Sequence, residues 1–153
     1  MMDDIEAEST PDDSRITVGS AVISLLGIVF GMVVIVGGTF MTWRSDMVLG
    51  LFTSTGWSFS NILSAGDGKI SLALGVIGFV SLLLGGALRN RWFYCLALAS
   101  SVLVLGLFVY ELVFIATRTG VVSPGTGLYM LLGGGMVGVL CSLGGYFMVR
   151  PQH

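Results

Sequence analysis

Four long apolar runs dominate the pattern of hydrophobic and polar positions, at residues 16–41, 70–88, 92–117 and 125–149. A helix needs about 20 residues to cross roughly 30 Å of hydrocarbon, and each run is close to that length. Closed barrels also span lipid, but they are built from alternating short segments, which this pattern lacks. The pattern predicts an all-α integral membrane protein, a single four-transmembrane-helix bundle over residues 16–150.

The polar break between the second and third runs consists of Arg89, Asn90 and Arg91. A connection this short joins only antiparallel neighbours. The two runs on either side, from Ile70 to Thr117, are therefore expected to fold back on each other and to set the topology of the bundle.

Small residues recur at helical spacing inside the runs. They are Gly27 and Gly31 in the first, Ser71, Gly75, Gly78, Ser81 and Gly85 in the second, and Gly134, Gly138 and Ser142 in the fourth. This spacing lets a neighbouring backbone approach closely. For the face with Gly27 and Gly31, two partners fit: the protein's own helices, or a second copy of the chain.

The one sizeable connection, residues 42–69, is not uniformly polar. Residues 47–52 are mainly apolar, residues 53–56 (Thr-Ser-Thr-Gly) are typical of a turn, and Trp57, Phe59 and Asn61 alternate with serines. Strand-like alternation beside a glycine-containing turn predicts a short β-hairpin-like outer loop between the first two helices. An interfacial amphipathic segment is the alternative.

The same connection ends on Gly66, Asp67 and Gly68. The glycines suit a tight turn, and Asp67 suits the cap of the helix that follows. The competing function of Asp67, a cation ligand, would need partner carboxylates, and none stands nearby in the sequence.

Composition agrees with a lipid environment, since 54% of the 153 residues are hydrophobic, 10% are charged and the mean hydropathy is +0.94. The acids are concentrated in residues 1–15, which predicts a disordered acidic tail. They are Asp3, Asp4, Glu6, Glu8, Asp12 and Asp13. Only seven residues are Lys or Arg, and they form no basic patch that would bind nucleic acid.

The basic residues set the expected orientation. With the amino terminus in the cytoplasm, the inner side holds four of them (Arg15, Arg89, Arg91 and Arg150) and the outer side three (Arg44, Lys69 and Arg118). The positive-inside rule therefore favours a multi-pass protein of the cell membrane with both termini cytoplasmic.

Glu111 is the one acid inside an apolar run. It lies about 9 Å before Thr117 along a helix, near the outer edge. An intramembrane acid is costly and is a functional candidate by default. Arg118, two turns further along the same face, predicts an ion pair with Glu111. The alternatives are a carboxylate that reaches interfacial water and a carboxylate that carries an ion or a proton.

Enzyme chemistry finds no support in the sequence. His153 is the single histidine, no Cys or Ser has a base beside it, and there is no phosphate loop or metal-ligand cluster. Cys95 and Cys141 fall inside apolar runs and are expected to be small packing residues. We expect no cofactor, no metal and no enzymatic activity.

Two resemblances bear on function. Trp43 with Gly50-Leu51-Phe52 is similar to the tryptophan and Gly-Leu-Trp of the claudin first loop, in a similar layout of four spans with a large first outer loop. The chain also resembles the small prokaryotic four-span membrane proteins with a Gly-Asp-Gly turn before the second helix, which mostly lack an assigned role. Both resemblances imply a compact bundle that presents one outer loop.

A third resemblance supports a different class of function. A glycine-rich helix, a short polar turn and a helix carrying Glu111 look like the proteolipid hairpin of rotary ATPases, which implies ion or proton translocation.

From the first two resemblances we expect a structural or accessory membrane protein. It would contact lipid and itself or other membrane proteins through Trp43, Phe52, Trp57 and Phe59. A small translocating protein that uses Glu111 is the alternative.

Overall fold

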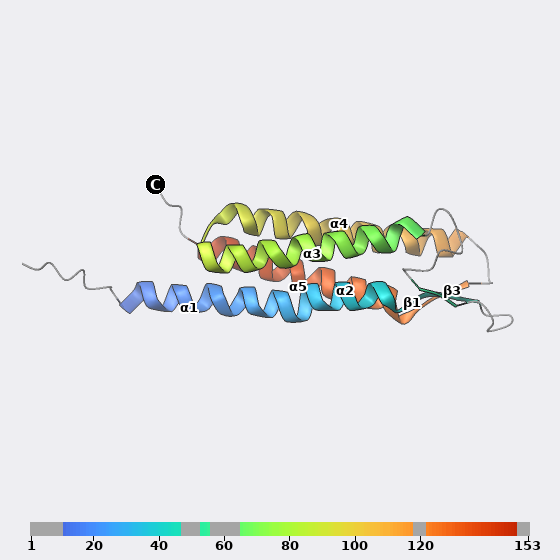
Figure 1. Ribbon diagram of the computed structural model, residues 1–153, viewed down its shortest axis with the longest axis horizontal. Coiled ribbons are helices and arrows are strands. Elements are labelled where there is room, and N and C mark those ends of the chain that lie inside the picture. The colour runs from blue at the N-terminus through green and yellow to red at the C-terminus, as the bar shows by residue number, and fades with distance from the viewer. Residues whose placement is uncertain (1–10, 47–52, 56–64, 118–121, 150–153) are drawn as a thin grey trace, which may run out of the picture.

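The computed structural model describes residues 11–46, 53–55, 65–117 and 122–149, and the side chains within 18–41, 68–117 and 123–149. Its elements, in chain order, are α1 (Pro11–Leu26), η1 (Gly27–Met32), α2 (Val33–Phe40), β1 (Thr42–Asp46), β2 (Thr53–Thr55), α3 (Ala65–Leu88), α4 (Arg91–Thr117), β3 (Val122–Pro124) and α5 (Thr126–Met148). The first three run on from one another as a single rod, in which η1 is a π-helical segment (Figure 1).

Four helices are long and apolar enough to cross a membrane: Val18–Phe40, Gly68–Leu88, Arg91–Thr117 and Thr126–Met148. They fall on the four predicted runs, so the four-helix prediction is confirmed. One boundary differs, because α1 begins at Pro11 and residues 11–15 of the expected tail are helical. Proline suits the first helical position, and acids in the first turn interact favourably with the helix dipole.

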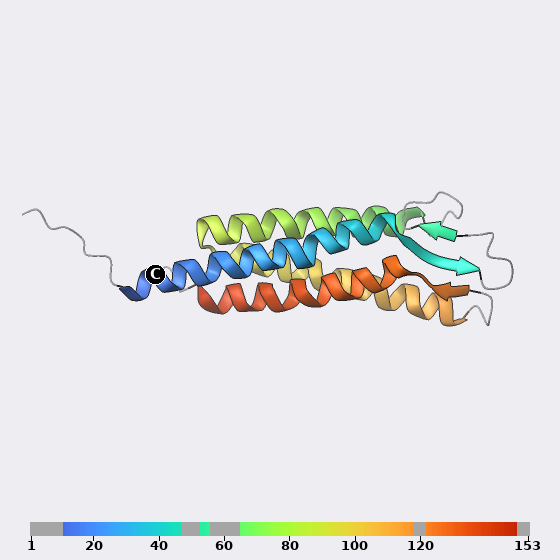
Figure 2. The same ribbon diagram turned by 90° about the horizontal axis from the view of Figure 1, so that it is seen from below.

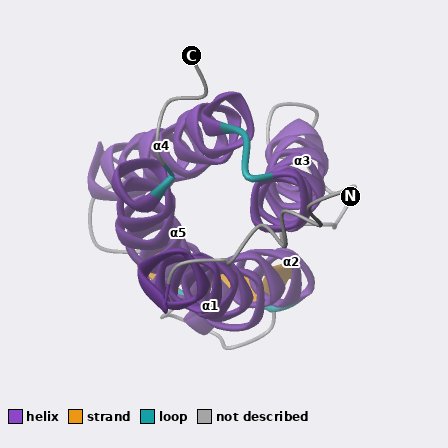
Figure 3. Cartoon of the chain, turned by 90° about the vertical axis from the view of Figure 1, so that its left-hand side faces the viewer, coloured by secondary structure: helices purple, strands orange, loops and turns teal. Residues whose placement is uncertain are grey.

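The helices alternate in direction and lie side by side in a ring, α1 and α2 beside α3, α3 beside α4, α4 beside α5, and α5 beside α1 and α2 (Figure 3). One end of the bundle carries the three strands and is called the sheet end here. The other carries the α3–α4 turn, the end of α5 and the start of α1, which projects past its neighbours (Figure 2). We call it the turn end.

The strands form a three-stranded sheet of order β2-β1-β3. Both pairings are antiparallel, with Arg44 opposite Ser54 in one and opposite Pro124 in the other. The turn expected at residues 53–56 is therefore misplaced, since Thr53–Thr55 is the strand β2. Residues 47–52 and 56–64 lie outside the described residues. The third strand comes from the connection before α5, which the sequence did not predict as a strand.

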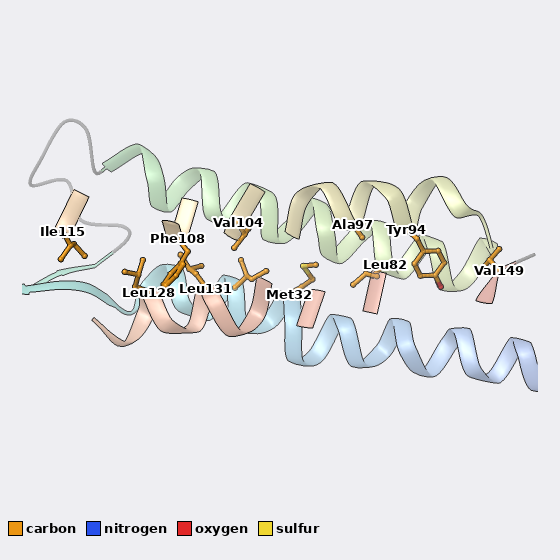
Figure 4. Packing of buried hydrophobic residues seen from close by; sticks show 11 residues of the cluster. Met32, Leu82, Tyr94, Ala97, Val104, Phe108, Ile115, Leu128, Leu131 and Val149 are labelled. Atoms are coloured by element: carbon orange, nitrogen blue, oxygen red, sulfur yellow. The ribbon is translucent and has the colours of Figure 1, made fainter. Parts of the chain in front are cut away.

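The interior of the bundle is lined with small residues and one narrow apolar cluster, while most large apolar side chains face outward. The cluster extends from Ile115 at the sheet end to Val149 at the turn end (Figure 4). Serine and threonine side chains are buried with it, and several donate to backbone carbonyls of their own helix, as Ser101 and Ser142 do. Large side chains outside and small ones inside suit a bundle dissolved in lipid.

Two helix backbones approach each other closely at Gly31 and Gly134. A Cβ built at Gly134 would lie 2.7 Å from the carbonyl oxygen of Gly31, and one at Gly31 would lie 3.3 Å from that of Gly134. Gly27 faces Cys141 and Leu82 in the same way. Within one chain this face is already covered by α5 and α3, so internal packing, and not a second copy, explains the spacing.

The α3–α4 turn is shorter than expected, because Arg91 is already the first residue of α4. Arg89 has φ 50°, the left-handed conformation that closes many helices. The side-chain oxygen of Asn90 accepts a hydrogen bond of 3.0 Å from the backbone N–H of Trp92, which caps α4. The antiparallel hairpin from Ile70 to Thr117 is as predicted.

Candidate functional site

Glu111 lies on the inward face of α4 and is fully buried. The face repeats every three or four residues, and its members are Tyr94, Ala97, Ser101, Val104, Phe108, Glu111 and Ile115. A carboxylate thus occupies a position that this helix otherwise fills with apolar or small residues. Glu111 is placed by the same periodicity that packs the core.

Two buried hydroxyls lie near the same end of the bundle. Thr39 Oγ1 lies 3.1 Å from the carbonyl oxygen of Ile35 and 3.3 Å from Ser71 Oγ, so a hydrogen bond connects α2 and α3. Both residues are fully buried. We name Thr39, Ser71 and Glu111 the sheet-end polar layer.

The register of the helices shows that these residues share a level. Gly145 and Gly138 of α5 lie against Tyr94 and Ser101 of α4. The same antiparallel register of α4 and α5 places Glu111 opposite Leu128. On the other side, a Cβ at Gly38 would lie 3.0 Å from the carbonyl oxygen of Gly127, so Thr39 lies at nearly the same height. The sheet-end polar layer therefore crosses the bundle close to the three strands.

The predicted pair of Glu111 with Arg118 stays a prediction, because Arg118 lies outside the described residues. Glu111 does have a polar or charge interaction. Its Oε1 atom, however, accepts no hydrogen bond within the part of the chain that the structure describes. The carboxylate is thus held inside the bundle.

Exposed aromatic side chains lie at two heights of the bundle. Trp92 and Phe147, each 76% exposed, lie at the turn end, and Tyr110 and Tyr129, each more than half exposed, lie towards the sheet end. Trp92 and Tyr110 are about 27 Å apart along α4, close to the thickness of a hydrocarbon core. Exposed Trp and Tyr at this spacing are typical of the two interfaces of a membrane, and Glu111 lies next to Tyr110.

The other predicted site residues are only partly described. The backbone of Trp43 lies in β1, while Phe52, Trp57 and Phe59 fall outside the described residues. The tight turn expected at Gly66, Asp67 and Gly68 is wrong, because α3 begins at Ala65 and all three are in its first turn. An acid in that turn still complements the helix dipole.

A second polar contact lies inside the turn end and was not predicted. Ser24 Oγ and Tyr94 Oη are 2.8 Å apart, which joins α1 to α4, and both side chains are buried. The sequence gives no sign of this contact, because Ser24 and Tyr94 are 70 residues apart. The inward direction of Tyr94 becomes visible only once the buried face of α4 is known.

The cysteines differ in their surroundings. Cys141 is partly buried beside Gly27, as expected of a packing residue, whereas Cys95 is exposed on the outside of α4. Among the described residues there is no cluster of three or more His, Cys, Asp or Glu side chains that could hold a metal ion.

Comparisons of the chain with protein-family models, with characterised proteins and with solved structures find no match. The function must therefore be argued from the bundle itself.

Proposed function

We propose that the chain is an integral membrane structural or accessory protein that holds an outer surface in place for contact with other membrane proteins. The observation that carries this proposal is the three-stranded sheet at one end of the bundle. Its central strand, β1, continues directly from the first membrane rod, and β3 leads directly into α5. Two connections are thus tied into one surface on a rigid base.

The arrangement of polar groups supports a structural role. Thr39 bonds to Ser71 between the neighbouring helices α2 and α3, and Ser24 bonds to Tyr94 across the bundle between α1 and α4, so buried polar groups join helices near each end of the bundle. Glu111, at the level of the outer aromatic belt, is proposed as a further tie, through the predicted ion pair with Arg118. In this proposal the claudin-like layout and the hairpin-like outer loop of residues 42–69 form the contact surface.

Partner binding tests the proposal. The chain, purified from native membranes in mild detergent, is expected to bring along a stoichiometric membrane protein. Replacing Phe52, Trp57 and Phe59 together by serine should abolish that association because it removes the apolar contact area of the outer loop. The measurement is quantitative mass spectrometry of the purified complex together with its native mass.

Leu140→Ala is the matched control, since it removes an exposed apolar side chain that faces lipid, far from the sheet. It should leave the complex unchanged, and both variants should melt like the native chain. A complex that survives the triple serine variant would exclude the outer loop as the contact surface. A chain that purifies alone in both forms would contradict an accessory role.

Orientation is a separate part of the proposal, in which the sheet end is extracellular and both termini are cytoplasmic. A cysteine introduced at Ser58, in a chain whose Cys95 and Cys141 are replaced by alanine, should react with a membrane-impermeant maleimide added to intact cells. Labelling that requires opened membranes would reverse the orientation. A cysteine at Gln152 should behave in the opposite way and serves as the control.

The alternative function is translocation of an ion or a proton through Glu111. The burial of this carboxylate, together with Thr39 and Ser71 at a similar level, favours it, because intramembrane acids often mark such pathways. The deeper buried hydroxyls support the structural role, since Ser101 and Ser142 donate to backbone carbonyls of their own helices. The two functions are separated by the behaviour of Glu111→Gln.

A further inference from the structure

Arg91 at the start of α4 is held in a fixed position by α5. Its Nε donates a hydrogen bond of 2.6 Å to the carbonyl oxygen of Val149, just beyond the end of α5. Its guanidinium carbon lies 5.1 Å from the centre of the Tyr146 ring, a cation–π contact. The ring of Phe147 packs edge-on against Tyr146 at 5.6 Å between centroids. The guanidinium is therefore oriented before any ligand arrives.

These contacts use only part of the guanidinium. The Nε bond and the ring contact occupy one edge and one face, and the two Nη groups make no hydrogen bond within the described part of the chain. Arg91 is only partly buried. A pre-oriented guanidinium with unused Nη donors matches the oxygens of a phosphate.

A second arginine lies in the same turn as Arg91. Arg89 is exposed there, and Trp92, the most exposed aromatic of α4, is next to Arg91. Asp12 and Asp13 belong to the start of α1, which projects past the turn end of its neighbours, and Glu111 is near the opposite end (Figure 2). Below the turn, the outward faces of α4 and α5 are apolar, with Leu96 and Leu143 exposed.

We propose that the α3–α4 turn binds the phosphate of an acidic phospholipid. The Nη groups of Arg91 and the charge of Arg89 would contact the phosphate, and the acyl chains would lie along the apolar surface below Trp92. Basic residues at a membrane boundary select anionic headgroups in this way. A phospholipid makes two contacts, its phosphate with the arginines and its acyl chains with the apolar surface. A small free anion makes only the contact with the arginines, so the site favours the lipid.

Native mass spectrometry of the delipidated chain with added lipid tests the proposal. Phosphatidylglycerol is expected to bind more tightly than phosphatidylcholine, by about fivefold for each arginine. Arg89→Gln should reduce this preference without touching the bond from Arg91 to Val149. Arg91→Lys keeps the charge but removes the guanidinium fork, and it should also reduce the preference. A melting measurement on each variant confirms that the bundle is folded.

Lys69→Gln is the matched control, since it removes one exposed positive charge at the sheet end. It should leave the preference for phosphatidylglycerol unchanged. Equal binding of both lipids by the native chain, or an equal loss in the Lys69 variant, would overturn the site. Displacement of the lipid by millimolar inorganic phosphate would overturn the lipid assignment and indicate a site for small anions.

Discussion

Replacing Gly145 by alanine is expected to destabilise the bundle by about 3 kcal/mol, the upper range for overpacking a core. A Cβ at this position of α5 would fall on the ring of Tyr94. The ring is fully buried, so it has no solvent-facing space into which it could turn. The free energy of unfolding, measured by titration with sodium dodecyl sulfate in mixed micelles, should show the loss.

The expected loss of stability in Gly145→Ala is large because the Tyr94 side chain is held by neighbours on several sides. On the opposite side of the ring, a Cβ at Gly85 of α3 would already lie 3.1 Å from the ring carbon Cε2. The phenol oxygen is held by Ser24 of α1. The Tyr94 side chain of α4 thus contacts all three other membrane rods. Displacing it disturbs the packing of α4 against each of them.

The adjacent glycine provides the control. A Cβ at Gly144 would lie 3.4 Å from Ile23, an ordinary van der Waals contact. Gly144→Ala should therefore change stability little, although it makes the same chemical change one residue away. Adding Tyr94→Leu to Gly145→Ala should recover part of the lost stability. Similar losses of stability in Gly144→Ala and Gly145→Ala would show that the ring of Tyr94 is not tightly packed between Gly85 and Gly145.

Replacing Glu111 by glutamine is expected to leave membrane insertion intact and to lower the free energy of unfolding by about 2 kcal/mol. Glutamine keeps the shape but removes the negative charge, and interactions of buried charged groups are worth roughly 1.5–3 kcal/mol. Tyr110→Phe is the control, because it alters a polar group at the same height on the outward face. An unchanged stability of Glu111→Gln would exclude Glu111 as an internal tie.

The same variant separates the two proposed functions. The structural proposal expects reconstituted vesicles of the native chain to carry no more protons or sodium than empty vesicles. A flux that the native chain supports and Glu111→Gln abolishes would establish translocation instead. Modification of Glu111 by a hydrophobic carbodiimide that sodium slows would also support translocation.

The membrane rods could be predicted because the runs at 16–41, 70–88, 92–117 and 125–149 report directly on lipid exposure. The small residues on the inner faces could be predicted too, since Gly134 and Gly138 repeat at helical spacing. The positions of the strands could not be predicted from the sequence. Whether Thr53–Thr55 is a turn or a strand depends on pairing with β1, and the position of β1 depends on β3, far along the chain.

For Glu111, the sequence predicts the height but not the direction. Counting residues from Thr117 gives its depth, whereas its inward orientation depends on which face of α4 meets α3 and α5. Tyr94 and Arg91 were missed for a related reason. Their partners, Ser24 and Val149, are distant in sequence, and no local pattern connects them.

The π-helical segment Gly27–Met32 determines where the first rod can lose a residue without changing its packing. Six residues at about 4.4 per π-turn rotate the chain by about 490°, and five residues of α-helix rotate it by about 500°. Removing one residue here would therefore leave both halves of the first rod with the same faces inward. Removing one elsewhere in the rod would turn half of it by about 100° and bring its large apolar side chains against α5. Homologous chains that differ by a single residue in the first rod should carry the difference between Gly27 and Met32.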